Sequence, residues 1–305
     1  MDKKNKQRIS LGAALAVITL ILVLVATGPE KKQTTSSQMK IAATMFPIAD
    51  ITKSIVGNRA TVITILPPGA SAHTYQPTPE TARQLQGTTV VFKIGAQLDD
   101  WADTIAATVG NPRLVTVSDG VTVPNIELRQ ATGAGSGNID PHYWLSPRLM
   151  KQVAKNIADT LCAIDPPSAA YYLENLSPVL SQLDWLLQTG QQELRGIKIR
   201  ELVTFHEAWY YFAADYGLTI AATFEPFPGQ EPTPQYLADL LKKLQDAKVT
   251  TLFTEPQLAA DTVRQFAADQ NLTLVELDPI GGVPGRQSYL ELMRYNITTV
   301  ATALQ

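Results

Sequence analysis

Histidine is scarce in this sequence, with only three in 305 residues. His73, His142 and His206 each lie in a short segment at the end of an apolar run or between a loop and a helical pattern. None of them falls on an ordinary solvated helix face. Because neutral imidazole is the commonest protein ligand for zinc-like metals, metal binding is the first hypothesis for this chain.

Cysteine is scarcer still, because Cys162 is the only one. A single cysteine excludes an intramolecular disulfide. Cys162 shares the apolar side of a helical pattern with Val153, Ile157 and Leu161. This position is typical of a small buried hydrophobic residue rather than of a ligand or nucleophile.

Charged residues make up only 17% of the chain, and the formal net charge is -3. No basic stripe is present that could neutralise phosphates, so we expect no nucleic acid partner. A hydrophobic content of 45% is typical of a globular protein. The length allows two domains of ordinary size, each with its own core.

The N-terminus has the layout of an export signal. Basic residues between Lys3 and Arg8 precede an apolar run from Leu11 to Thr27, and a polar stretch follows. We therefore interpret residues 1–28 as a signal peptide or an N-terminal anchor, with residues 9–27 as the anchoring part, and residues 29–38 as a polar linker. No cysteine follows the run, which argues against a lipid-modified cysteine there. Both alternatives place the body of the protein outside the cytoplasm, in the periplasm or at the outer face of the cytoplasmic membrane.

From residue 39 onward, short apolar runs alternate with amphipathic stretches, the pattern of an α/β fold with mainly parallel strands. A long helical pattern between them indicates a stiff connection. We predict an N-terminal α/β lobe at 39–165, a bridging helix at 166–195 and a C-terminal α/β lobe at 196–305, with Rossmann-like lobes and a metal site in the cleft between them. The expected strands are 40–44, 60–66, 90–94, 201–205, 220–224, 250–254 and 272–277.

The three histidines and two acidic residues sit where such a fold places ligands, since open α/β sheets bind them beyond the carboxyl ends of their strands. His73, His206, Glu255 and Asp278 each follow a predicted strand, and His142 lies between a loop and a helix. Three nitrogens and one carboxylate oxygen would complete a tetrahedral shell of the kind zinc favours. Taken alone, Asp278 before Pro279 and Glu255 before Pro256 also suit turn or capping roles.

Six motifs in order then give a specific resemblance over about residues 39–305. They are PGASAHTYQPTP at 68–79, DPHYWLSP at 140–147, HEAWYYF at 206–212 with YGL at 216–218, EPTP at 231–234, FTEPQ at 253–257 and LDPIGG at 277–282. This set is similar to the zinc/manganese solute-binding proteins of ABC transporters. The resemblance implies two lobes bridged by a long helix, with the metal held between them.

In that family the ligand positions correspond to His73, His142, His206 and Asp278. Histidine at the third position is typical of zinc binders and glutamate of manganese binders, so His206 favours Zn2+ over Mn2+ as the transported ion. The implied partner is an ABC transporter permease in the membrane, and we expect a monomer. The sequence departs from the family at Ala72 and Gln76, and residues 121–139 contain no histidine, so no secondary metal-gathering loop is expected.

Other functions stay open at this point. The chain could be a manganese-specific member of the same family, or a surface-anchored adhesin. A zinc-dependent hydrolase would use three histidines and a water, with Glu207 or Glu255 as the base. The H-E-x-x-H motif of metalloproteases is not met, because position 210 is tyrosine. We expect a binding protein with a closed site rather than an enzyme.

Overall fold

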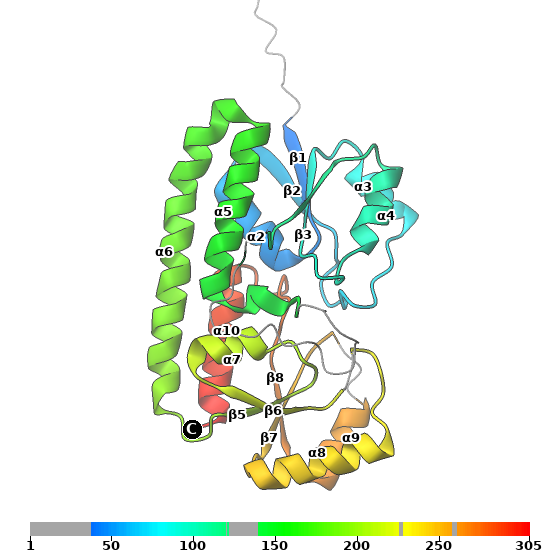
Figure 1. Cartoon of the computed structure of the whole chain (residues 1–305), viewed down its shortest axis with the longest axis vertical. Helices are drawn as coiled ribbons and strands as arrows, with labels where there is room; N and C mark the ends of the chain where they lie inside the picture. The colour runs from blue at the N-terminus through cyan, green and yellow to red at the C-terminus, as the bar shows by residue number, and fades with distance from the viewer. Residues whose placement is uncertain (1–37, 120, 122–139, 226–227, 258–260) are drawn as a thin grey trace, which may run out of the picture. The chain divides into compact units, whose positions relative to one another are not determined.

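Two four-stranded sheets, each with all of its strand pairs parallel, form the framework of this computed structural model (Figure 1). The structure describes residues 38–119, 121, 140–225, 228–257 and 261–305. The first sheet has the order β2-β1-β3-β4, with β1 at Met39–Ala43, β2 at Ala60–Thr64, β3 at Val90–Lys93 and β4 at Arg113–Thr116. The second has the order β6-β5-β7-β8, with β5 at Glu201–Thr204, β6 at Thr219–Thr223, β7 at Thr251–Thr254 and β8 at Thr273–Glu276.

Helices connect successive strands, as parallel pairing requires. Those of the first lobe are α2 (Phe46–Val56), α3 (Pro79–Leu85), α4 (Trp101–Thr108), η1 (His142–Leu145) and α5 (Pro147–Ile164). The bridge consists of η2 (Pro166–Ser168), α6 (Ala169–Glu193) and η3 (Leu194–Gly196). The second lobe contains α7 (Tyr210–Tyr216), α8 (Pro234–Ala247), α9 (Asp261–Asp269) and α10 (Tyr289–Ala303).

The bridging helix α6 runs along one side of both lobes (Figure 1). Its 25 residues make a rod of about 38 Å at 1.5 Å per residue. It packs against α2 and α5 of the first lobe and against α7 and α10 of the second. Gly190 allows the closest approach, since a Cβ there would lie 2.6 Å from the ring of Tyr216 and 2.9 Å from Ile297. The helix is thus fixed to both lobes by side-chain packing.

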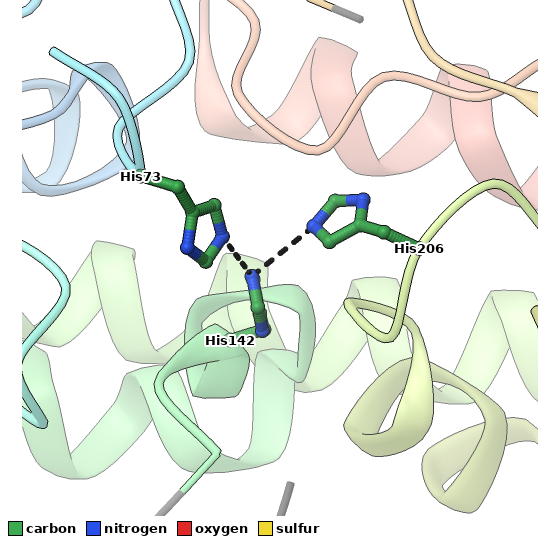
Figure 2. Close-up of side chains that lie close together, drawn as sticks. All are labelled: His73, His142 and His206. Atoms are coloured by element: carbon green, nitrogen blue, oxygen red, sulfur yellow. Dashed lines mark hydrogen bonds between the residues drawn. The ribbon is translucent and has the colours of Figure 1, made fainter. Parts of the chain in front are cut away.

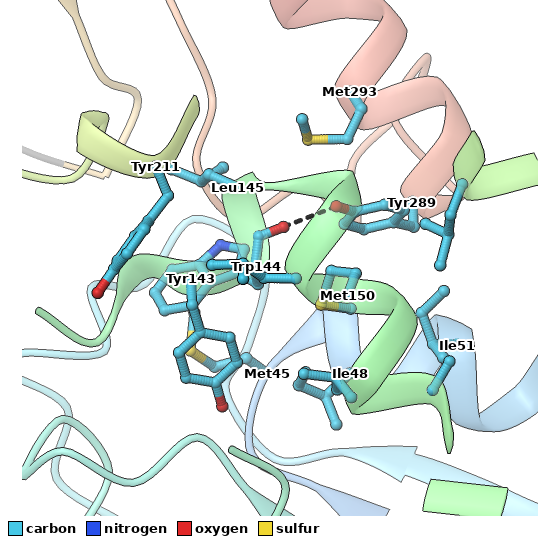
Figure 3. Close-up of a cluster of buried hydrophobic side chains, with 14 of the residues drawn as sticks. Met45, Ile48, Ile51, Tyr143, Trp144, Leu145, Met150, Tyr211, Tyr289 and Met293 are labelled. Atoms are coloured by element: carbon cyan, nitrogen blue, oxygen red, sulfur yellow. Dashed lines mark hydrogen bonds between the residues drawn. The ribbon is translucent and has the colours of Figure 1, made fainter. Parts of the chain in front are cut away.

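One apolar core continues from the first lobe into the second. Its residues include Ile48 of α2, Met150 of α5, Leu183 of α6 and Met293 of α10. Figure 3 shows the part of this core around η1, where the side chains of Tyr143, Trp144 and Leu145 meet their neighbours. Residues 39–305 form a single compact unit. The two lobes therefore share a core that constrains their relative position.

The predicted α/β architecture, with two parallel sheets and a long helix between them, is confirmed. The sequence pattern missed one strand, β4, which adds to β3 at the edge of the first sheet. The predictions for residues 1–28, and for the linker except Gln38, lie outside the described residues, as does the loop at 121–139 except Val121. Within the described ranges, no helix combines the length and apolar character needed to cross a membrane.

Because α6 packs against both lobes, replacing a buried leucine on that helix should destabilise the protein far more than replacing an exposed one. Leu183 is 1% exposed and Leu173 is 52% exposed. We expect Leu183→Ala to lower the free energy of unfolding by about 2–5 kcal/mol, because it leaves a cavity in the shared core. Leu173→Ala, the matched control, should change it by less than about 0.5 kcal/mol. Urea denaturation of both variants measures this, and equal losses would show that α6 is not held by its buried face.

Candidate metal centre

His73 lies in the loop that follows β2, and several hydrogen bonds anchor this loop. Backbone pairing extends beyond the strand through Leu66, whose N–H donates to the carbonyl of Thr44 at 2.9 Å. At the other end, Thr78 caps α3 and forms a capping box with Thr81. Beside the histidine, the indole of Trp101 donates to the carbonyl of Ala72 at 3.4 Å. These contacts direct the His73 ring toward the other two histidines (Figure 2).

His142 is the first residue of η1, and the side chain of Asp140 holds it in two ways. An Asp140 oxygen accepts the backbone N–H of His142 at 2.9 Å and lies 2.7 Å from its ring Nδ1. Both side chains are buried. The carboxylate therefore favours the tautomer with the proton on Nδ1, which leaves the Nε2 lone pair free to bind a metal.

His206 lies just after β5, and Glu255 follows the neighbouring strand β7. Glu255 acts on His206 as Asp140 acts on His142. The Glu255 carboxylate lies 2.8 Å from Nδ1 of His206. The indole of Trp209 donates to the same carboxylate at 3.0 Å. Glu255 is 4% exposed. It thus orients the second imidazole from a buried position.

The three Nε2 atoms converge from three separate chain segments. Nε2 of His142 lies 3.1 Å from that of His73 and 3.4 Å from that of His206 (Figure 2). Around a tetrahedral zinc ion with Zn–N bonds of about 2.0–2.1 Å, ligand nitrogens are about 3.3 Å apart. Among the described residues, these histidines form a group whose ligand atoms all lie within 4.8 Å of one another. Their spacing therefore fits a single metal ion.

The cavity beside the histidines is small. Its lining includes Met45, Trp144 and Ile280, and its volume is about 20 Å³. A space of this size accommodates one water or one ion. Its walls come from both lobes.

The pKa values of His73 and His206 are shifted in opposite directions. Desolvation, together with the nearby His142 and His206, lowers the pKa of His73 to about 2. Burial acts most strongly to lower the pKa of His206, but the carboxylates of Glu255, Glu225 and Asp140 together outweigh it and raise that pKa above its usual value. His73 is thus neutral, as a metal ligand must be, whereas a proton would compete with a metal ion at His206.

Asp278, the predicted fourth ligand, is not among the residues that line the cavity and lies outside the three-histidine group. Its neighbours Pro279 and Ile280 line the cavity, and so does Gln257, whose amide donates to Asp278 Oδ1 at 2.8 Å. The backbone of Asp278 is held on both sides by the Asn296 side chain at 2.8 and 2.9 Å. The structure thus brings the three histidines together and leaves Asp278 outside their group.

Sequence reasoning did not assign the two carboxylates that orient the imidazoles. Asp140 was part of a motif without a role of its own, and Glu255 was considered as a ligand, a base or a turn residue. A signal for Asp140 was present in its spacing, because an aspartate two residues before a histidine can accept that residue's backbone N–H. Glu255 pairs with His206 because β5 and β7 are neighbours in the second sheet. The sequence does not show this, because it does not give the order of the strands within the sheet.

Comparison with known proteins agrees with this arrangement. The family model for ZnuA, described as zinc-uptake complex component A periplasmic, matches residues 41–303. The manganese ABC transporter substrate-binding lipoprotein PsaA of Streptococcus pneumoniae serotype 4 is 32% identical over 309 residues, covering 96% of this chain and 98% of PsaA. The iron ABC transporter substrate-binding lipoprotein MtsA of Streptococcus pyogenes serotype M6 is 30% identical over 315 residues, covering 98% of this chain and 99% of MtsA.

A solved structure has the same fold. The crystal structure of a ZnuA deletion mutant with zinc bound matches with a TM-score of 0.77 and 28% sequence identity. The match covers 88% of this chain and 99% of that one. The similarity therefore extends over both lobes and the helix between them.

Two parallel α/β lobes, a single long bridging helix and a cavity for one ion between the lobes define a substrate-binding protein of a metal ABC transporter. The chain belongs to the ZnuA family of such proteins. Members of this family are binding components and not enzymes. The predicted resemblance is confirmed, and the hydrolase alternative is set aside.

The Glu255–His206 pair predicts how pH affects metal binding. Removing the carboxylate with Glu255→Gln should weaken metal binding at about pH 8 by roughly 10–100-fold, because the imidazole becomes less basic and less well oriented. The same change lowers the pKa of His206, so the loss of affinity on acidification should begin at a lower pH than in the parent protein. Competition titrations with a chromophoric chelator between about pH 5.5 and pH 8 measure both effects.

Glu80→Gln serves as the control, since it removes an exposed carboxylate on α3 that pairs with Arg83. It should bind metal as the parent protein does at every pH. An unchanged affinity and pH profile in Glu255→Gln would contradict the orienting role of Glu255.

Proposed function

We propose that this protein captures Zn2+ outside the cytoplasm and delivers it to the membrane permease of an ABC importer. His73, His142 and His206 are the proposed ligands, and Asp278 is the proposed fourth. The observation that carries the proposal is the convergence of three Nε2 atoms at 3.1 and 3.4 Å beside a one-ion cavity. In this account the ion is cargo, so the site must both hold and release it.

The donor set supports zinc over manganese. Imidazole nitrogens suit zinc, whereas manganese prefers carboxylate, carbonyl and water oxygens. Carboxylates are close to the histidines, but Asp140 and Glu255 bind the Nδ1 atoms and act on the imidazoles rather than on the ion. The names of the relatives point in different directions, since PsaA is named for manganese, MtsA for iron and ZnuA for zinc.

Delivery from outside the cytoplasm is consistent with the relatives and with the sequence. PsaA and MtsA are named as lipoproteins of ABC transporters, and the ZnuA family is described as periplasmic. Residues 1–28 would then export the protein, and the permease would receive the ion.

The only cysteine, Cys162, lies within α5. The monomeric state and the adhesin alternative stay predictions.

Removing one imidazole tests the site directly. We expect His142→Ala to abolish tight Zn2+ binding, because His142 lies between the other two histidines and its loss opens the shell. Asp278→Ala should weaken binding less, since water can replace a monodentate carboxylate. Isothermal titration with Zn2+, and competition with Mn2+, measure both, and the parent protein should retain zinc when both ions are offered.

Cys162→Ser is the matched control, because it removes the only thiol, a strong zinc donor, from a helix away from the cavity. Its affinity should equal that of the parent. Tight zinc binding by His142→Ala would show that the ligands lie elsewhere, and preference for Mn2+ would assign the chain to the manganese-specific alternative. Elemental analysis of protein purified without added metal gives an independent check.

A further inference from the structure

Asp278 is a buried carboxylate whose two oxygens have different surroundings. Oδ1 accepts three N–H groups, from Ile280 at 2.9 Å, from Gly281 at 3.0 Å and from the Gln257 amide at 2.8 Å. Oδ2 is buried and has no hydrogen-bond partner. The Asp278 side chain is 1% exposed, so the negative charge on Oδ2 depends on whatever cation lies nearby.

That cation is the guanidinium of Arg286, whose Nε lies 3.2 Å from Oδ2. Arg286 stands only eight residues further along, because the chain reverses in a tight turn in which Gly282 N–H donates to the carbonyl of Arg286 at 2.9 Å. Gly281 and Gly282 have φ of 77° and 79°, values that favour glycine. The turn is thus built in a way that returns Arg286 to Asp278.

Arg286 also has partners that do not depend on Asp278. Its Nη1 donates to Glu276 at 2.9 Å, and its guanidinium lies 4.4 Å from the centre of the Tyr295 ring. Glu276 is partly exposed, so its charge stays solvated with or without Arg286. The guanidinium therefore keeps an ion pair and a cation–π contact when Asp278 turns away.

Asp278 also lies next to residues that line the place of a second possible cation. Pro279, Ile280 and Gln257, which adjoin Asp278, line the cavity of the three histidines. The Asn296 side chain holds the Asp278 backbone in place. The Asp278 side chain can therefore exchange one partner for another while its own backbone stays fixed. The guanidinium of Arg286 already neutralises much of the charge on this carboxylate and so reduces its attraction for a divalent ion, and the two cations therefore compete for it.

We infer that Arg286 is a positioning residue that holds Asp278 in the metal-free protein and competes with the metal for it. This inference rests on the proposed function. Arg286 lowers the affinity of the site below what a free Asp278 would give, and it takes the carboxylate back when the ion leaves. It thereby makes release to the permease faster.

The test compares Zn2+ affinity and dissociation rate in four proteins: the parent, Arg286→Gln, Asp278→Asn and the double variant. Arg286→Gln should bind Zn2+ roughly tenfold more tightly and release it more slowly, within the range usual for coupling between two groups. Arg286→Lys, which keeps the charge, should stay close to the parent. In the Asp278→Asn background, Arg286→Gln should have no effect, because the group through which it acts is gone.

Arg294→Gln is the matched control, since it removes another arginine of the same lobe that pairs with Glu193 at 3.0 Å. It should leave zinc affinity unchanged. Circular dichroism shows whether each variant folds. If Arg286→Gln alone does not fold, Arg286→Met replaces it in the same comparison, and a zinc affinity no tighter than that of the parent overturns the inference.

Two results would overturn the inference while leaving the proposed function intact. One is a folded Arg286→Gln variant that binds zinc no more tightly than the parent. The other is an effect of Arg286→Gln that persists in the Asp278→Asn background. A parent protein that fails to bind zinc would instead overturn the proposed function itself.

Discussion

The position of η1 between the two lobes is the constraint on which the rest of the site depends. The Trp144 indole donates to the carbonyl of Pro279 at 2.7 Å, and the Tyr289 hydroxyl donates to the carbonyl of Trp144 at 2.7 Å. Both partners belong to the C-terminal lobe, whereas Tyr143 reaches the carbonyl of Ile94 in the first lobe at 2.9 Å. His142 is therefore held at the junction of the lobes, where ligands from either side can meet it (Figures 2 and 3).

Buried charge explains how a site at this junction can be both selective and reversible. Asp140 and Glu255 act on the far nitrogens of two imidazoles, so they strengthen these ligands without adding oxygens to the shell. Asp278 is a third buried carboxylate, and it is the one with a positively charged partner of its own. The proposed affinity therefore reflects a balance between ligand strength and the demand of Arg286 for the same carboxylate.

Much of this arrangement was predictable, because hydrophobic periodicity and turn residues are local signals. His73 follows a strand of the first sheet and His206 a strand of the second, and the rule that open α/β sheets bind ligands beyond the carboxyl ends of their strands predicted both as site residues. The edge strand β4 was missed, although it resembles β8, which the pattern did predict, in its length of four residues and its partial exposure. The Asp278–Arg286 pair could not be predicted either, because it depends on a turn through Gly281 and Gly282, and spacing along the chain does not show which way the turn folds.

X-ray absorption at the zinc edge of the zinc-loaded protein tests the central claim most directly, because it reports the atoms bound to the ion. The account predicts three imidazole nitrogens at about 2.0–2.1 Å together with one oxygen. A sulfur neighbour, a shell made only of oxygens, or fewer than three imidazole nitrogens would contradict it.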